Sequence, residues 1–285
     1  MTTFYAQNAL GGLAYGSLLF LIAAGFTLIF GLMRVVNIAQ TAFFLIGVYV
    51  GLMLTNHGVP FFAAVPLAGA AVTVIGLAIY RVLHPYHADE LTALLLTIGF
   101  TLMLDDGALA VWGGDPQSVA PPAMLASSLQ VGTLIFPSYW LALIGISLLI
   151  GAALAFVERR TMLGAVIRAG VDDEEMIRGL GIDVDRAFFI VFGIGAFLAG
   201  AGGLLGGPIT GAYPGLDGEL LPLAFAVIII GGIGSLEGAY VGSLVIGLVG
   251  TFGKALFPQL SYFTIFVPVA AIMALRPQGL LGRKR

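Results

Sequence analysis

Long stretches of this chain contain no charged side chain. These stretches are residues 1–33, 35–80, 187–216, 220–236, 238–253 and 255–275. A helix needs about 20 mainly apolar residues to cross the roughly 30 Å hydrocarbon core of a bilayer. Charged residues make up only 9% of the chain, against roughly 25% in soluble domains. The composition therefore excludes a soluble enzyme, a nucleic-acid-binding protein and a disordered chain, and the lipid bilayer is the expected surrounding.

The apolar stretches of the chain predict nine membrane-spanning helices: 9–30, 37–55, 60–80, 91–112, 138–157, 187–207, 219–236, 238–254 and 260–275. Their apolar residues are continuous rather than alternating, which excludes an outer-membrane β-barrel. The short segments 219–236 and 260–275 contain Pro222 and Pro268. If one of them re-enters the membrane from one side, eight spans remain. We expect an all-α polytopic membrane protein in which residues 1–285 form one transmembrane domain.

The distribution of Lys and Arg indicates which way the chain faces. Crossing the nine spans in alternation places eleven of the twelve Lys and Arg residues on one side and only Lys254 on the other. Because loops rich in Lys and Arg stay in the cytoplasm, the C-terminus is expected inside and the N-terminus outside. The first twelve residues hold no Lys or Arg, unlike a signal peptide, so the first apolar run is expected to belong to the mature protein.

The expected cytoplasmic loop 158–186 holds 12 of the chain's 27 charged residues. Asp172 and Glu175 have the spacing of a capping box, which predicts a short helix beginning at Asp172, and Gly181 is suited to ending it. Three apolar residues share one face of this helix: Met176, Ile177 and Leu180. This face is expected either to dock in the groove of a partner protein or to pack on the protein's own inner surface.

Small residues recur every four positions in three of the expected spans. One stripe is Gly195, Ala199, Gly203 and Gly207, and the others are Gly234, Gly238 and Gly242, and Gly231, Ser235, Ala239, Ser243 and Gly247. Such stripes let helix backbones approach closely, for ordinary packing or for a surface that slides during transport. The run Gly231, Gly232, Ile233, Gly234, Ser235 disfavours a regular helix. A break is expected there, where backbone groups line a cavity.

Several polar side chains fall at membrane depth. Asp105 and Asp106 lie in the span 91–112, where a carboxylate is costly and marks a functional site by default. The alternative is that this helix ends early and both residues lie in the outer interface. Asn37 and Gln40 lie at the start of the second span, where they either line a pathway or cap the helix. Solvated positions are expected for Asp217 and Glu219, which lie in an outer loop.

The residues present do not support covalent chemistry. The chain has no Cys, so it offers no thiol nucleophile, and it lacks the G-x-x-x-x-G-K-[ST] motif of a phosphate-binding loop. His57, His84 and His87 lie in expected loops and are interpreted as structural or solvated. We therefore expect a transport protein rather than an enzyme, with no cofactor bound by this chain.

Five segments in the same order resemble the permease subunits of bacterial branched-chain amino acid ABC transporters, a family that also includes relatives for urea, short amides and aromatic acids. The segments are GFTLIFGLMRVVNIAQ (25–40), Thr97-Ile98-Gly99, RAGVDDEEMIRGLGI (168–182), GGIGSLEGAYVG (231–242) and RPQGLLG (276–282). The resemblance covers nearly the whole chain. It implies a type II importer architecture in the bacterial inner membrane, with a translocation path formed near Asn37, Gln40 and Thr97.

The resemblance also implies partners. A second permease, either homologous or a second copy, is expected across a pseudo-twofold interface. Two cytoplasmic ATPases that hold ATP and Mg²⁺ are expected on the loop helix at 172–181, and an external binding protein delivers the solute. The family has Gly where this chain has Thr41, and neutral polar residues where it has Asp105 and Asp106. A cationic or amine-bearing solute is therefore one hypothesis for the substrate.

Two other classes of transporter remain as alternatives. An ion-coupled secondary transporter would use Asp105 and Asp106 as coupling sites and would need no ATPase. A passive channel for a small neutral solute would need neither a partner-docking helix nor metabolic energy.

Overall fold

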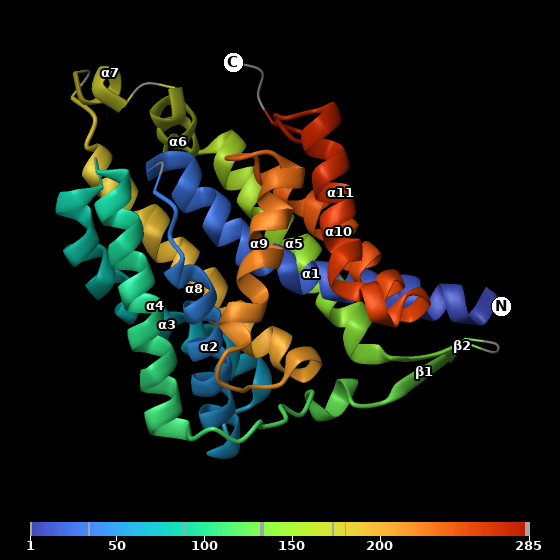
Figure 1. Ribbon diagram of the computed structural model, residues 1–285. Helices are drawn as coiled ribbons and strands as arrows, with labels where there is room; N and C mark the ends of the chain where they lie inside the picture. The colour runs from blue at the N-terminus through green and yellow to red at the C-terminus, as the bar shows by residue number, and fades with distance from the viewer. Residues whose placement is uncertain are drawn as a thin grey trace.

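A computed structural model of the protein describes residues 2–33, 35–87, 89–131, 134–172, 174–179 and 181–282, which form a bundle of apolar helices (Figure 1). The longer helices are α1 (Thr2–Met33), α2 (Ala39–Asn56), α3 (Phe61–Leu83), α4 (Glu90–Trp112), α5 (Ser138–Arg160), α8 (Val184–Thr210) and α10 (Leu236–Leu256). The shorter ones are α6 (Met162–Asp172), α7 (Glu174–Gly179), α9 (Leu216–Gly231) and α11 (Ser261–Leu275). Three 3₁₀ turns join them: His84–Tyr86, Ala123–Leu125 and Pro258–Leu260.

The all-α membrane architecture expected from the sequence is confirmed. In the described chain, seven helices are long and apolar enough to cross a membrane: α1, α2, α3 with its 3₁₀ turn, α4, α5, α8 and α10. All nine expected spans are helical, but α9 and α11 are the two short ones. Both contain an internal proline, Pro222 and Pro268, as do the longer helices α3, with Pro66, and α8, with Pro208.

The centre of the bundle is formed by α1, α2 and α8. Helix α8 packs against α3, α2 and α1, and α1 packs against α10 as well. Small residues make these close approaches possible. A Cβ built at Gly203 of α8 would lie 2.7 Å from the Val48 amide nitrogen and closer still to the Phe44 carbonyl oxygen, both on α2. The expected close packing along this stripe is therefore confirmed.

The two ends of the bundle differ. One end carries α6 and α7 and is here called the loop end. The other carries the antiparallel hairpin of β1 (Ser128–Val131) and β2 (Leu134–Pro137) and is here called the hairpin end (Figure 1). Helix α4 runs from Glu90 near the loop end to Trp112 at the hairpin end.

The loop between α5 and α8 differs from the sequence-based expectation. Helix α6 extends through Asp172, and the next helix, α7, covers Glu174–Gly179. Asp172 therefore ends one helix instead of capping the start of another, and the predicted capping box is wrong. The physical reason is that the residues before Asp172 contain no proline and continue a helix. The predicted end of the second helix is confirmed, because Gly181 adopts a φ of +79° just beyond it.

Candidate functional site

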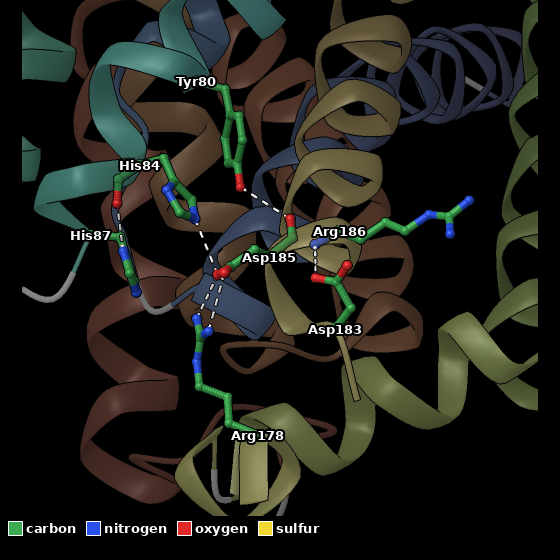
Figure 2. Close-up of polar contacts among 7 residues, drawn as sticks. All are labelled: Tyr80, His84, His87, Arg178, Asp183, Asp185 and Arg186. Carbon is green, nitrogen blue, oxygen red and sulfur yellow. Dashed lines mark hydrogen bonds and ion pairs between the residues drawn. The ribbon is translucent and has the colours of Figure 1, made fainter. Parts of the chain in front are cut away.

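A cluster of polar side chains ties α7 to the bundle at the loop end. Arg178 of α7 donates two hydrogen bonds to the Asp185 carboxylate, with Nη2 2.6 Å from Oδ1 and Nη1 3.2 Å from Oδ2. Asp185 lies in the first turn of α8. His84, just after α3, donates from Nε2 to the same Oδ1 at 3.2 Å. Figure 2 shows these side chains converging from three elements, so Asp185 joins α7, α8 and the end of α3.

Neighbouring contacts fix the geometry of this cluster. Asp183 caps α8 by accepting a hydrogen bond from the Arg186 amide at 2.9 Å (Figure 2). The Tyr80 hydroxyl donates to the Asp185 carbonyl oxygen at 3.2 Å. His87 donates to the His84 carbonyl oxygen at 2.6 Å, and the two rings stack with centroids 5.2 Å apart. His84 and His87 therefore contribute to structure, as expected, and His57, just after α2, is exposed.

The residues expected to contact a partner lie on or next to α7. Glu175, Met176 and Ile177 are in this helix, while Leu180 lies outside the described residues. Met176 is 63% exposed. Two further apolar side chains of the same loop, Met162 and Ile182, are also exposed. The loop end therefore presents apolar side chains beside charged ones, and their docking role stays a prediction.

The first of two helix breaks joins α1 to α2. Helix α1 ends at Met33 and α2 begins at Ala39. Thr97 of α4 is fully buried and accepts a hydrogen bond from the Ile38 amide at 3.3 Å. Its hydroxyl lies 2.8 Å from the Leu94 carbonyl oxygen and 3.2 Å from that of Val36. Thr97 therefore satisfies backbone groups that the break leaves without helical partners.

Two buried amides flank this break. Gln40 donates from Nε2 to the Gly195 carbonyl oxygen of α8 at 2.8 Å, which places it on the small-residue stripe. Its Oε1 atom, and both polar atoms of Asn37, find no hydrogen-bond partner among the described residues. Both side chains are fully buried. Because buried polar groups are nearly always paired in folded proteins, these two amides are candidates for contact with a polar solute.

Thr97→Val is expected to lower the free energy of unfolding by about 1–3 kcal/mol, because it leaves the half-buried Ile38 amide without its acceptor. Thr101→Val is the matched control. The Thr101 hydroxyl only bonds back to the Thr97 carbonyl oxygen on its own helix, at 2.7 Å. Thermal unfolding of the two purified variants measures the difference. Equal loss of stability in both would contradict the assigned role of Thr97.

The second break lies between α9 and α10, where the sequence predicts it. Gly232 and Gly234 have φ values of +100° and +77°. The carbonyl oxygens of Ile230 and Gly231 accept hydrogen bonds from the Leu280 and Leu281 amides at 2.8 and 3.0 Å. The C-terminal segment therefore satisfies the end of α9.

Contacts on the other side of this break connect it to the first one. Ser235 caps α10 by accepting from the Gly238 amide at 3.0 Å. A Cβ built at Gly31, near the end of α1, would lie 3.3 Å from the Gly234 Cα atom. The break at Gly231–Ser235 is thus next to the end of α1. Its place in a translocation path stays a prediction, as does that of the break near Asn37.

The acidic residues near the hairpin end are arranged in a way that the sequence did not indicate. Helix α4 continues to Trp112, so the alternative that it ends before Asp105 is wrong. Asp105 is half-buried and accepts from the Gly215 amide at 3.2 Å, whereas Asp106 is exposed. Asp217 is only 5% exposed, so its expected solvation is also wrong, although Glu219 is exposed. Burial and the neighbouring Asp105 carboxylate raise the pKa of Asp217 to about 6.

The fold and these sites together define a multi-pass α-helical membrane protein whose helices are interrupted at buried polar groups. The model of the family of branched-chain amino acid transport system permease components matches residues 8–275, so the chain belongs to that family and is a transport protein rather than an enzyme. Its membership also supports a multi-pass protein of the inner membrane.

Curated relatives match along almost the full chain. The high-affinity branched-chain amino acid transport system permease protein BraD of Pseudomonas aeruginosa is 29% identical, covering 98% of this chain and 96% of its own. LivH of Escherichia coli K12, which carries the same description, is 28% identical with the same coverage. A probable branched-chain amino acid transport permease protein of Methanocaldococcus jannaschii is 27% identical, covering 95% and 91%. No solved structure matches the chain.

Proposed function

We propose that the whole chain acts as one permease domain of an ABC importer. It forms part of the translocation path for a small solute and transmits movements from cytoplasmic ATPase subunits. The names of the relatives support a branched-chain or other hydrophobic amino acid as the solute. Urea, short amides and aromatic acids are the other candidates. ATP and Mg²⁺ are bound by the ATPases, and this chain binds no cofactor.

The observation that carries this proposal is the exposed apolar surface of an anchored loop. Met162 and Met176 are 80% and 63% exposed, on helices outside the apolar bundle. Exposed apolar side chains rimmed by charges are typical of protein interaction sites. The bond from Arg178 to Asp185 links this surface to α8, which packs against α1, α2 and α3. A force on α7 therefore has a direct route into the centre of the bundle.

The charge distribution supports the orientation and the other partners. The loop end carries Arg159, Arg160 and Arg186, so we assign it to the cytoplasm by the excess of positive charge. The N-terminus is then outside and the C-terminus inside. A second permease, homologous or identical, completes the path, and an external binding protein delivers the solute at the hairpin end.

In the proposed mechanism, the path opens and closes at the two helix breaks, between α1 and α2 and between α9 and α10. ATP binding by the partner subunits pushes on α7, and the Arg178–Asp185 pair moves α8. The Gly203 stripe lets α8 slide against α2. This movement opens or closes the path at Asn37, Gln40 and Thr97 and at the neighbouring break Gly231–Ser235. The unpaired amide atoms of Asn37 and Gln40 bind the polar part of the solute.

A pull-down from native membranes tests the assembly. A tagged chain in mild detergent is expected to recover two ATPase subunits and a second permease. Recovery of the chain alone, under conditions that keep a control ABC complex intact, would contradict the proposal. It would favour the ion-coupled class, and loss of uptake in Asp105→Asn and Asp106→Asn with intact assembly would then be the next test of that class.

Met176→Glu is expected to lower ATPase recovery about tenfold or more in this pull-down, because a charge replaces an apolar side chain on the proposed docking surface. The side chain is exposed, so the permease itself should fold. Met124→Glu is the matched control, since Met124 is 75% exposed in the chain segment leading to the hairpin. Unchanged ATPase recovery with Met176→Glu would exclude this surface.

A further inference from the structure

Polar groups from three helices gather near the hairpin end. They are Asp105 of α4, Asp217 of α9 and Tyr49 of α2, here called the outer acidic cluster. The carboxyl groups of Asp105 and Asp217 are close enough for a hydrogen bond between them, in which the charged Asp105 is the acceptor. The Gly215 turn, with a φ of +88°, brings the start of α9 against α4 by donating to Asp105 at 3.2 Å.

Tyr49 joins the cluster because its ring contacts α4, the helix that carries Asp105. Its ring stacks on Trp112 with centroids 5.0 Å apart and planes inclined by 16°. Trp112 follows Asp105 by two helical turns and therefore shares its face of α4, while Asp106 points about 100° away. Tyr49 is fully buried, and its hydroxyl oxygen has no hydrogen-bond partner in the described chain.

The cluster has acceptor atoms without a counter-charge. Asp217 is 95% buried, and its Oδ1 atom has no hydrogen-bond partner among the described residues. Among the described residues, ion pairs join Arg159 to Glu237, and Arg178 and His84 to Asp185, and none of them reaches the cluster. Buried carboxylates are retained where a cation pairs with them. The arrangement therefore calls for a positive ligand.

The chemistry of the cluster favours an organic cation over a metal ion. Within the described residues, no group of three or more His, Cys, Asp or Glu residues could hold a metal. The cluster offers only two carboxylates, with a phenol whose ring is stacked on a tryptophan. Carboxylates accept charge-assisted hydrogen bonds from the three donors of a primary ammonium group, and aromatic rings attract such a cation.

We propose that the outer acidic cluster binds the ammonium group of the transported solute as it enters from the outside. This inference rests on the proposed function, because it assumes that the hairpin end faces the delivering protein. It narrows the solute to one that carries a protonated primary amine. Urea, short amides and aromatic acids lack that group, and two carboxylates without a cation repel an acid.

The experiment compares two probes with the same carbon skeleton, 3-methylbutylammonium chloride and the neutral 3-methylbutanamide. Each is titrated into the purified assembled complex at neutral pH, and the thermal unfolding midpoint reports the apparent affinity. The amine is expected to raise the midpoint and the amide to leave it unchanged. Asp105→Asn and Asp217→Asn are expected to weaken the apparent affinity for the amine about tenfold or more, as loss of a charged hydrogen-bond partner does. Asp106→Asn, the matched control, stays within about twofold.

Several results would overturn the proposal. They are equal stabilisation by the amide, equal stabilisation by sodium or potassium chloride at the same ionic strength, and equal weakening by Asp106→Asn. If Asp217→Asn fails to assemble, Asp105→Asn and Tyr49→Phe decide in its place, and undiminished amine binding in both would overturn the assignment. The pull-down tests the proposed function separately from this inference, because a chain recovered without ATPases can still be titrated with the amine.

Discussion

Gly203→Val is expected to abolish accumulation of the folded permease. The Cβ atom alone would enter the space held by the Phe44 carbonyl oxygen and would lie 2.7 Å from the Val48 amide nitrogen. Both obstacles are backbone atoms of α2, so no change of side-chain rotamer relieves the clash. Valine adds two methyl groups at the same place. Overpacking of a dense core costs roughly 1–3 kcal/mol or more, and a clash with backbone lies at the upper end.

The measurement is the yield of monodisperse protein from a fluorescently tagged chain on size-exclusion chromatography. Gly145→Val in α5 is the matched control, because a Cβ at Gly145 meets no atom within 4 Å. Its yield should equal that of the unchanged chain. A normal elution profile for Gly203→Val would show that α2 and α8 do not touch along this stripe. It would also exclude this stripe as the sliding surface of the proposed mechanism.

The sequence predicted the helices well because apolar length is a local property. Each of the nine expected segments is helical, and the GGIGS break falls where glycine disfavours a helix. Helix α6 was missed because its apolar run, residues 162–167, is too short to predict a membrane span and lies in a loop rich in charged residues. The β1–β2 hairpin was missed because its strands are only four residues long each, too short to show an alternating pattern.

The sequence alone could not predict the contacts between distant segments of the chain. Arg178 and Asp185 are seven residues apart, and His84 is about a hundred residues away from both. Nothing in their spacing predicts that they meet. Asp217 was read as a solvated loop residue because its neighbours are proline, glycine and acidic residues, yet the turn at Gly215 folds it against Asp105. Thr97 was named by resemblance alone, and its bonds to the α1–α2 break supply the physical reason.

Arg178→Glu is expected to lower ATP-driven uptake about tenfold or more, within the range of typical coupling energies between sites. The substitution places a negative charge against Asp185 and detaches α7 from α8. The Arg178 and Asp185 side chains are 38% and 47% exposed, so the pair contributes at most about 1 kcal/mol to stability. The protein should therefore fold and still bind its ATPases, with ATP hydrolysis continuing but no longer producing transport.

Exchanging the charges of Arg178 and Asp185 distinguishes loss of the link between α7 and α8 from a general loss of protein structure. Combining Arg178→Asp with Asp185→Arg restores opposite charges across the same gap and should recover part of the lost uptake. Arg159→Glu is the matched control: Arg159 forms an ion pair with Glu237 between α5 and α10, with the two side chains 66% and 50% exposed, and this pair does not involve α7. Uptake and ATPase rates in proteoliposomes give both quantities. Equal loss of uptake in Arg159→Glu, or no recovery in the swapped pair, would show that loop-end charge rather than this pair carries the coupling.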